Sequence, residues 1–247
     1  SRLARLYRLY WLGVMDYGLI LQILFLERVV RSRRLIRLAF RRIIPAFLIH
    51  NWRVTDRSSS MLVMRHDAFR HIEIEVFVRR DKLVDALGFA QEAIKVAGGR
   101  ESTLSADNQQ RIEELGMQEA LAELHDQYCH HYPICVRRVL PDDTLISMAS
   151  GGEQDWYALS FISYANPARR AGFFLFANFM AQSMSQLFHA RPHWGKVCPL
   201  EANELTSHYP RFDDFRTVCN TLDSQGVFQN DWTAALLEAD GSVEDNS

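Results

Sequence analysis

The segment RPHWGK, from Arg191 to Lys196, brings together side chains that can do chemistry. His193 and Lys196 supply an imidazole and an ammonium, and Trp194 and Gly195 separate them. Packing alone gives no reason for this order of residue types. A fixed ammonium can stabilise negative charge that develops on a bound group. The simpler alternative is a surface lysine after a turn, and these residues alone do not decide between the two.

A second group contains potential metal ligands. His125 and Cys129 are four residues apart and could ligate zinc from one helical face, with His130 and His131 next to them. The remaining ligands of a tetrahedral site are not evident in the sequence. A helix end with several imidazoles is more often a cap with exposed polar side chains. We therefore expect no metal here.

The middle of the chain predicts the elements that would position such residues. Alternation from Ile72 to Val78 predicts a half-buried strand with Glu73 and Glu75 on one face. A functional pair of carboxylates is conceivable there, and a solvated sheet face is the simpler explanation, which we expect. Asp81 is expected to cap the next helix, and the pair Gly98–Gly99 to end it. Further along we expect a loop over 100–110, a helix over 112–124, strands over 134–139, 144–149 and 156–164, and a long helix over 173–187. This order is typical of an α+β fold, an antiparallel sheet with helices on one face.

The chain has 247 residues, of which 48% are hydrophobic, so it can bury a sizeable core. A net charge of -2 argues against nucleic acid as the main partner. The first 53 residues are rich in arginine and predict two or three helices, which Pro45 should end or kink. Their basic face is either a solvated helix face that packs against another part of the protein, or a surface that binds phosphate or lipid. The apolar run from Tyr17 to Leu26 is too short to span a membrane.

No signal peptide is evident, and four cysteines without paired spacing indicate a reducing compartment, so we expect a cytoplasmic protein. The basic N-terminal helices add an expectation of peripheral membrane association. The chain starts at Ser1 rather than at a methionine, and we expect it to be part of a longer protein.

Two further segments extend the HWGK motif. The chain reads YPRFDDF from Tyr209 to Phe215 and LDSQGVFQN from Leu222 to Asn230. In this order and spacing, the three segments resemble the C-terminal part of the aldonolactone oxidase and alditol oxidase group of FAD-linked oxidases, in the vanillyl-alcohol oxidase superfamily. The group includes D-arabinono-1,4-lactone oxidase. A lone HWGK would be a weak signal, whereas three ordered segments are a strong one.

The resemblance implies a function. Members oxidise an alcohol carbon of a sugar lactone, polyol or related molecule by hydride transfer to flavin. By this likeness Lys196 is expected to be catalytic and to lie beside the FAD ring, where a cation stabilises the reduced form. His193 is expected to order the loop at the ring, and Asn230 to close the flavin edge.

The same resemblance places a substrate site on the strand over 134–139. Members carry a Glu-x-Arg pair before an Asp-Asp pair, which here is Asp142–Asp143. Arg137 then matches the family arginine, a catalytic and substrate-binding residue, and Cys135 falls on the glutamate. A thiol with a pKa of about 8.5 is a poor substitute for a carboxylate that orients a hydroxyl. Arg137 could equally be a structural ion-pair partner.

We therefore divide the chain into a basic helical segment (1–55), an α+β substrate domain (56–190) and a short helical flavin-facing segment (191–247). The expected partners are a polyol or lactone substrate and an N-terminal FAD-binding domain, because no glycine-rich phosphate loop is found here. The alternative is a catalytically inactive relative that retains the fold as a binding or membrane-associated module.

Overall fold

The computed structural model describes residues 2–18, 21, 24–25, 29, 32–47, 49, 53–61, 71–130, 132–164 and 170–237. The chain divides into two compact units. The first contains Ser1–Ile72, Cys129–Tyr132 and Ser163–Asn166, and the second contains Glu73–Tyr128, Pro133–Ile162 and Pro167–Ser247.

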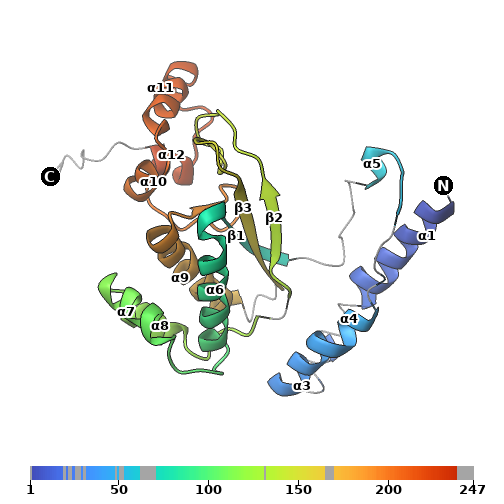
Figure 1. Ribbon diagram of the computed structural model, residues 1–247. Helices are drawn as coiled ribbons and strands as arrows, with labels where there is room; N and C mark the ends of the chain where they lie inside the picture. The colour runs from blue at the N-terminus through green and yellow to red at the C-terminus, as the bar shows by residue number, and fades with distance from the viewer. Residues whose placement is uncertain are drawn as a thin grey trace. The chain divides into compact units, whose positions relative to one another are not determined.

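The second unit is built on a four-stranded antiparallel sheet with the order β2-β3-β1-β4 (Figure 1). The strands are β1 (His71–Arg79), β2 (Cys135–Val139), β3 (Trp156–Tyr164) and β4 (Arg191–Pro192). In the β2–β3 pair Cys135 lies opposite Ser160, and in the β1–β4 pair Val76 lies opposite Pro192. The predicted α+β fold is confirmed, including the strands expected over 72–78, 134–139 and 156–164.

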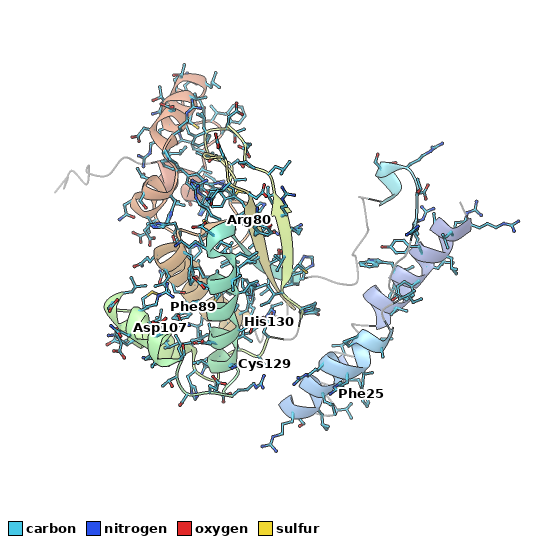
Figure 2. All side chains as sticks on the ribbon, in the orientation of Figure 1. Phe25, Arg80, Phe89, Asp107, Cys129 and His130 are labelled. Carbon is cyan, nitrogen blue, oxygen red and sulfur yellow. The ribbon has the colours of Figure 1, made fainter. Side chains whose placement is uncertain are left out.

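Helices cover one face of this sheet, as expected. The two long ones are α6 (Leu83–Ala97) and α9 (Arg170–Phe188), which pack against each other. Phe89 of α6, labelled in Figure 2, stacks on Phe179 of α9 with ring centroids 6.2 Å apart. Phe161 of β3 meets Phe176 of α9 edge to face at 5.8 Å. The apolar alternation of the strands and the 3.6-residue stripe of α9 therefore meet in one core.

The predicted details around these helices need correction. Asp81 does not cap α6, because it lies inside a single 3-10 turn, η4 (Arg80–Lys82), and makes no cap hydrogen bond. Gly98 and Gly99 do end α6. The expected single helix over 112–124 is two helices, α7 (Ala106–Glu114) and α8 (Gln118–Leu124), and α7 begins inside the expected loop. Gly116 separates them with a φ of 69°, a value that glycine adopts without strain.

The strand expected over 144–149 is also wrong, because this segment is a loop closed by Asp142. One carboxylate oxygen of Asp142 accepts hydrogen bonds from the Thr144 amide at 3.1 Å and hydroxyl at 2.6 Å. The other accepts the Ser147 hydroxyl at 2.6 Å. These local bonds replace ladder bonds and favour a turn.

The C-terminal segment is helical, as predicted. It contains α10 (Ala202–His208), α11 (Phe212–Leu222) and α12 (Asp231–Leu237). Tyr209 and Phe212, at the junction of α10 and α11, are buried with Leu200 and Leu205 in a small core of their own.

The first unit contains the predicted N-terminal helices. They are α1 (Arg2–Tyr10), η1 (Trp11–Gly18), α3 (Arg33–Leu38), η3 (Ala39–Ile43), α4 (Ile44–Phe47) and α5 (Ser58–Met61). Pro45 lies where the segment changes from the π geometry of η3 to the α geometry of α4, not at its end. In the part of the chain that the structure describes, no helix has both the length and the apolar character needed to cross a bilayer.

Candidate functional site

The HWGK loop is attached to β1 by backbone hydrogen bonds. After β4 ends, the amide of His193 donates to the carbonyl of Glu75 at 2.9 Å, and the amide of Val197 donates to the carbonyl of Glu73 at 3.3 Å. Between them the Lys196 amide donates to the His193 carbonyl at 3.1 Å and closes a turn. The loop is therefore held at both ends on the edge of the sheet.

Lys196 points its ammonium at two carboxylates of β1. Its Nζ lies 2.5 Å from Oε2 of Glu75 and 2.7 Å from Oε1 of Glu73. Both glutamates occupy alternate positions of β1, so they share the sheet face opposite α6 and α9, which we call the uncovered face because these two helices leave it free. The lysine side chain is 22% exposed. The lysine after this turn is therefore paired with carboxylates and is not directed into bulk water.

Arg137 of β2 reaches the same carboxylate from the other side. Its guanidinium pairs with Oε1 of Glu75 and lies 3.3 Å from the hydroxyl of Ser160 on β3. That hydroxyl donates to the same Glu75 oxygen at 2.9 Å. The side chain of Arg137 is 60% exposed, so one side of the guanidinium faces solvent. The structural ion pair considered for Arg137 exists, and it leaves donor capacity for a ligand.

Glu75 is the centre of this group and was misread from the sequence. The solvated sheet face expected for it is wrong, because the residue is 1% exposed. Burial alone would raise the pKa of Glu75, but hydrogen bonds from Lys196, Ser160 and Arg137 outweigh burial and hold the pKa below its usual value. Glu75 is therefore a buried, ionised carboxylate at neutral pH.

Cys135 begins β2 on the same face as Arg137, since it is two residues away and lies opposite Ser160. It is exposed, and its thiol is free. The position that the family resemblance assigns to a glutamate therefore carries a thiol, which has little hydrogen-bonding capacity.

His193 organises the loop from within. Its Nδ1 accepts the amide of Gly195 at 3.0 Å, which requires this nitrogen to be deprotonated. Burial lowers the pKa of His193, and the charge of Lys196 lowers it further, so the neutral form is favoured. The ring lies 6.1 Å from that of Phe77, which belongs to the same sheet face.

Trp194 joins the HWGK and YPRFDDF motifs in one aromatic cluster. Its ring lies 5.2 Å from Tyr209, 6.3 Å from Phe212 and 6.4 Å from Trp232. Its indole nitrogen donates to the carbonyl of Ile146 at 2.9 Å. The HWGK and YPRFDDF segments therefore pack together, with Trp232 of α12, and support the loop.

Asn230, which the resemblance places at the flavin edge, makes hydrogen bonds with Thr233 in this structure. Its side-chain oxygen accepts the amide of Thr233 at 2.9 Å, and its own amide donates to the Thr233 hydroxyl at 2.8 Å. This reciprocal pair caps α12, a role that Asn suits.

The geometry also changes the reading of the histidine-rich segment. Because α8 ends at Leu124, His125 and Cys129 are not on one helical face, which zinc ligation from a helix would need. Among the described residues no cluster of His, Cys, Asp and Glu has the arrangement of a metal site. His131 lies outside the described residues.

The uncovered sheet face thus carries two cations and two carboxylates within direct contact. The guanidinium of Arg137 can bind an oxygen of a ligand, and the ammonium of Lys196 can place positive charge beside an electron-rich group. Sequence reasoning identified the cations, preferred a solvated face to a functional role for Glu75, and missed Ser160. The only signal was a pair of glutamates in an otherwise apolar strand.

Comparison with known proteins supports the family resemblance. The sequence profile described as ALO: D-arabinono-1,4-lactone oxidase matches residues 28–236. A protein of an uncultured marine euryarchaeote, named long-chain alcohol oxidase, is 89% identical over 245 residues, which is 99% of this chain and 51% of that protein. This chain thus spans about half the length of that relative.

More distant relatives match over shorter stretches. An L-gulono-1,4-lactone dehydrogenase of Mycobacterium tuberculosis is 34% identical over 107 residues, 43% of this chain and 23% of that protein. An alditol oxidase of Streptomyces is 45% identical over 51 residues, 21% of this chain and 12% of that protein. The resemblance to the aldonolactone oxidase group is confirmed. Because the profile covers well over half of its residues, this chain belongs to the D-arabinono-1,4-lactone oxidase family.

Proposed function

We propose that this chain is the substrate-binding C-terminal part of an FAD-dependent oxidoreductase that oxidises the carbon of a CH–OH group. The observation that carries the proposal is the HWGK loop, which is fixed to β1 so that Lys196 and Arg137 share one buried carboxylate. The names of the relatives, which are oxidases and dehydrogenases of alcohols and lactones, support the reaction class. The FAD-binding part would lie in the half of the longer relative that this chain does not match.

The side chains on the uncovered face fit a flavin. An ammonium and a neutral imidazole on one short loop suit the polar edge of an isoalloxazine ring, which becomes more negative on reduction. Lys196 and His193 would hold this edge, while Asn230 would act through α12, which it caps. When bound, FAD supplies the acceptor for the hydride that leaves the alcohol carbon.

The residues of this chain would bind and orient the alcohol. The solvent-facing side of the Arg137 guanidinium would donate hydrogen bonds to a substrate oxygen and fix the reacting carbon. Lys196 would hold positive charge where negative charge develops. His193, through the Gly195 amide, would keep the loop in the geometry that directs the ammonium toward the sheet.

Cys135 bears on the substrate class. A site that lacks the family glutamate loses a hydrogen-bond partner for a neighbouring hydroxyl, so the advantage of a polyol over a simple alcohol should fall. The 89% identical relative is named for long-chain alcohols. We therefore propose a simple primary alcohol with an alkyl chain as the preferred substrate, ahead of a sugar lactone or polyol.

The test uses the full-length protein that contains this chain. Anaerobic bleaching of the flavin absorbance band is followed with 1-dodecanol, xylitol and L-gulono-1,4-lactone. Lys196→Met is expected to slow bleaching on the order of a hundredfold, the scale for loss of one charge-stabilising group. Equal rates in wild type and variant would remove Lys196 from the mechanism.

A matched variant tests the substrate class. Cys135→Glu restores the family carboxylate and is expected to raise the ratio of xylitol to dodecanol rates. An unchanged ratio would contradict the role assigned to this position. Arg138→Met, on the opposite face of β2, serves as the control and should leave both rates unaltered.

A second candidate is the inactive binding module, and the exposed side chains of the first unit favour it. Leu3, Leu6 and Leu9 of α1 are exposed next to Arg2 and Arg5. Leucines with arginines on one helix suit the surface of an anionic bilayer. This module would lie at the cytoplasmic face of a membrane without turnover.

Sedimentation of the full-length protein with vesicles of phosphatidylserine and phosphatidylcholine, at two salt concentrations, tests the membrane contact. Salt-sensitive binding to the anionic vesicles supports the contact, and its absence ends the membrane version. A colourless full-length protein that binds such vesicles would favour the module, whereas a yellow protein that bleaches with alcohol favours the enzyme.

A further inference from the structure

One carboxylate joins the two cations of the site. Glu75 gives Oε2 to Lys196 and Oε1 to Arg137 and Ser160, so each oxygen serves a different part of the fold. Lys196 belongs to the loop after β4, and Arg137 and Ser160 belong to β2 and β3. Because β1 lies between β3 and β4 in the sheet, the side chain of Glu75 can reach residues on the β3 side and on the β4 side.

The cations depend on Glu75 to different degrees. Lys196 has a second carboxylate, Glu73, at 2.7 Å. In the described part of the chain, the carboxylate that Arg137 contacts is Glu75. Loss of Glu75 would therefore release the more exposed Arg137 and leave Lys196 on one partner.

The charges of the group also balance. Two glutamates and two cations lie on the uncovered face, and Glu75 is the most deeply buried of the four. A buried charge is costly unless it is paired and hydrogen-bonded, and removal of one partner leaves the other uncompensated. The carboxylate and the cations thus stabilise one another, with Glu75 at the shared point.

We propose that Glu75 is a positioning residue that sets Lys196 and Arg137 at a fixed separation for the substrate. This inference rests on the proposed function. It acts through these cations and takes no part in the chemical step. Its three hydrogen bonds leave little capacity for a ligand, and its burial keeps it from solvent.

A labelling experiment tests the positioning without following substrate oxidation. The chain has three lysines, Lys82, Lys95 and Lys196. Acetylation of each in the full-length protein is timed by peptide mass spectrometry. Glu75→Gln should make Lys196 label several-fold faster, because the ammonium loses its closer carboxylate and gains access to solvent. Lys82 and Lys95 should keep their rates, which shows that the fold is intact.

Matched variants separate this effect from a general loss of charge. Asp155→Asn removes the partner of Arg138, 2.8 Å away, and should leave Lys196 labelling unchanged. Ser160→Ala, a milder change that removes one hydrogen bond to Oε1 of Glu75, serves if Glu75→Gln does not fold, and it should give a smaller increase in Lys196 labelling. If Lys196 labels at the wild-type rate in every folded variant of Glu75 and Ser160, the positioning role is wrong.

Steady-state kinetics then measure coupling. Glu75→Gln is expected to lower kcat/KM by at least about tenfold, the scale for a lost charged hydrogen bond. Arg137→Met should cost less in the Glu75→Gln background than in wild type, because both remove the same arrangement. Additive effects would contradict the proposal. A wild-type protein that oxidises no alcohol would overturn the proposed function, while the labelling result would still decide the contact of Glu75 with Lys196.

Discussion

Arg191, at the start of the loop-bearing segment, is predicted to be a main source of local stability. It is 3% exposed, and its guanidinium lies between the rings of Trp156, at 4.4 Å, and Tyr209, at 4.5 Å. It donates to the carbonyl of Ser150 at 2.7 Å and to that of His208 at 2.5 Å. One side chain therefore ties β4 to the loop after β2 and to the end of α10.

The magnitude follows from opposing effects. Replacement by methionine leaves two carbonyls without a charged donor and removes two cation–π contacts. Together these changes remove roughly 5–6 kcal/mol of stabilisation from the folded state. Burial lowers the pKa of Arg191 to about 10, which indicates that the charged form is penalised in the fold. Relief of this penalty returns about 3 kcal/mol. We therefore expect Arg191→Met to lower the free energy of unfolding by about 2–3 kcal/mol.

The assay is urea unfolding followed by tryptophan fluorescence and far-UV circular dichroism, with linear extrapolation to water. Arg191→Lys should cost at least as much as Arg191→Met, because lysine retains a buried charge without the planar fork that reaches both carbonyls. Arg138→Met, in an exposed pair with Asp155, is the control and should leave the free energy of unfolding close to the wild-type value. A change within about 0.5 kcal/mol for Arg191→Met would refute the reasoning.

Three further predictions concern stability. Burial, with the charges of neighbouring side chains, lowers the pKa of His208 to about 4. The stability that the neutral imidazole contributes is therefore complete above about pH 6.5 and is lost as pH falls toward 4, by roughly 2–3 kcal/mol. Urea unfolding at several pH values should show a weaker dependence of the free energy of unfolding on pH in His208→Gln. Gly172→Ala should destabilise by more than about 2 kcal/mol, because its Cβ would overlap the Gln127 carbonyl, and thermal unfolding against a Gly88→Ala control measures this. Asn230→Ala should cost about 1 kcal/mol and increase amide exchange in α12; exchange equal to wild type would contradict the cap.

Local periodicity made several elements predictable from the sequence. The alternation of β1 and the apolar stripe of α9 are set by backbone geometry within a few residues, so both elements appear where they were expected. The loop closed by Asp142 was not predicted, because its hydrogen bonds compete with a strand pattern that looks acceptable.

The sequence by itself determined the family, through three ordered motifs, and it identified Lys196 and Arg137 as the cations of interest. Only the tertiary structure decided what they contact. Glu75 and Lys196 are 121 residues apart, and their contact depends on β4 joining the edge of β1. Such pairing depends on strand order and register, and residue periodicity does not encode either of them. The physical reason is that periodicity is local, whereas a buried charge needs a partner that only folding brings to it.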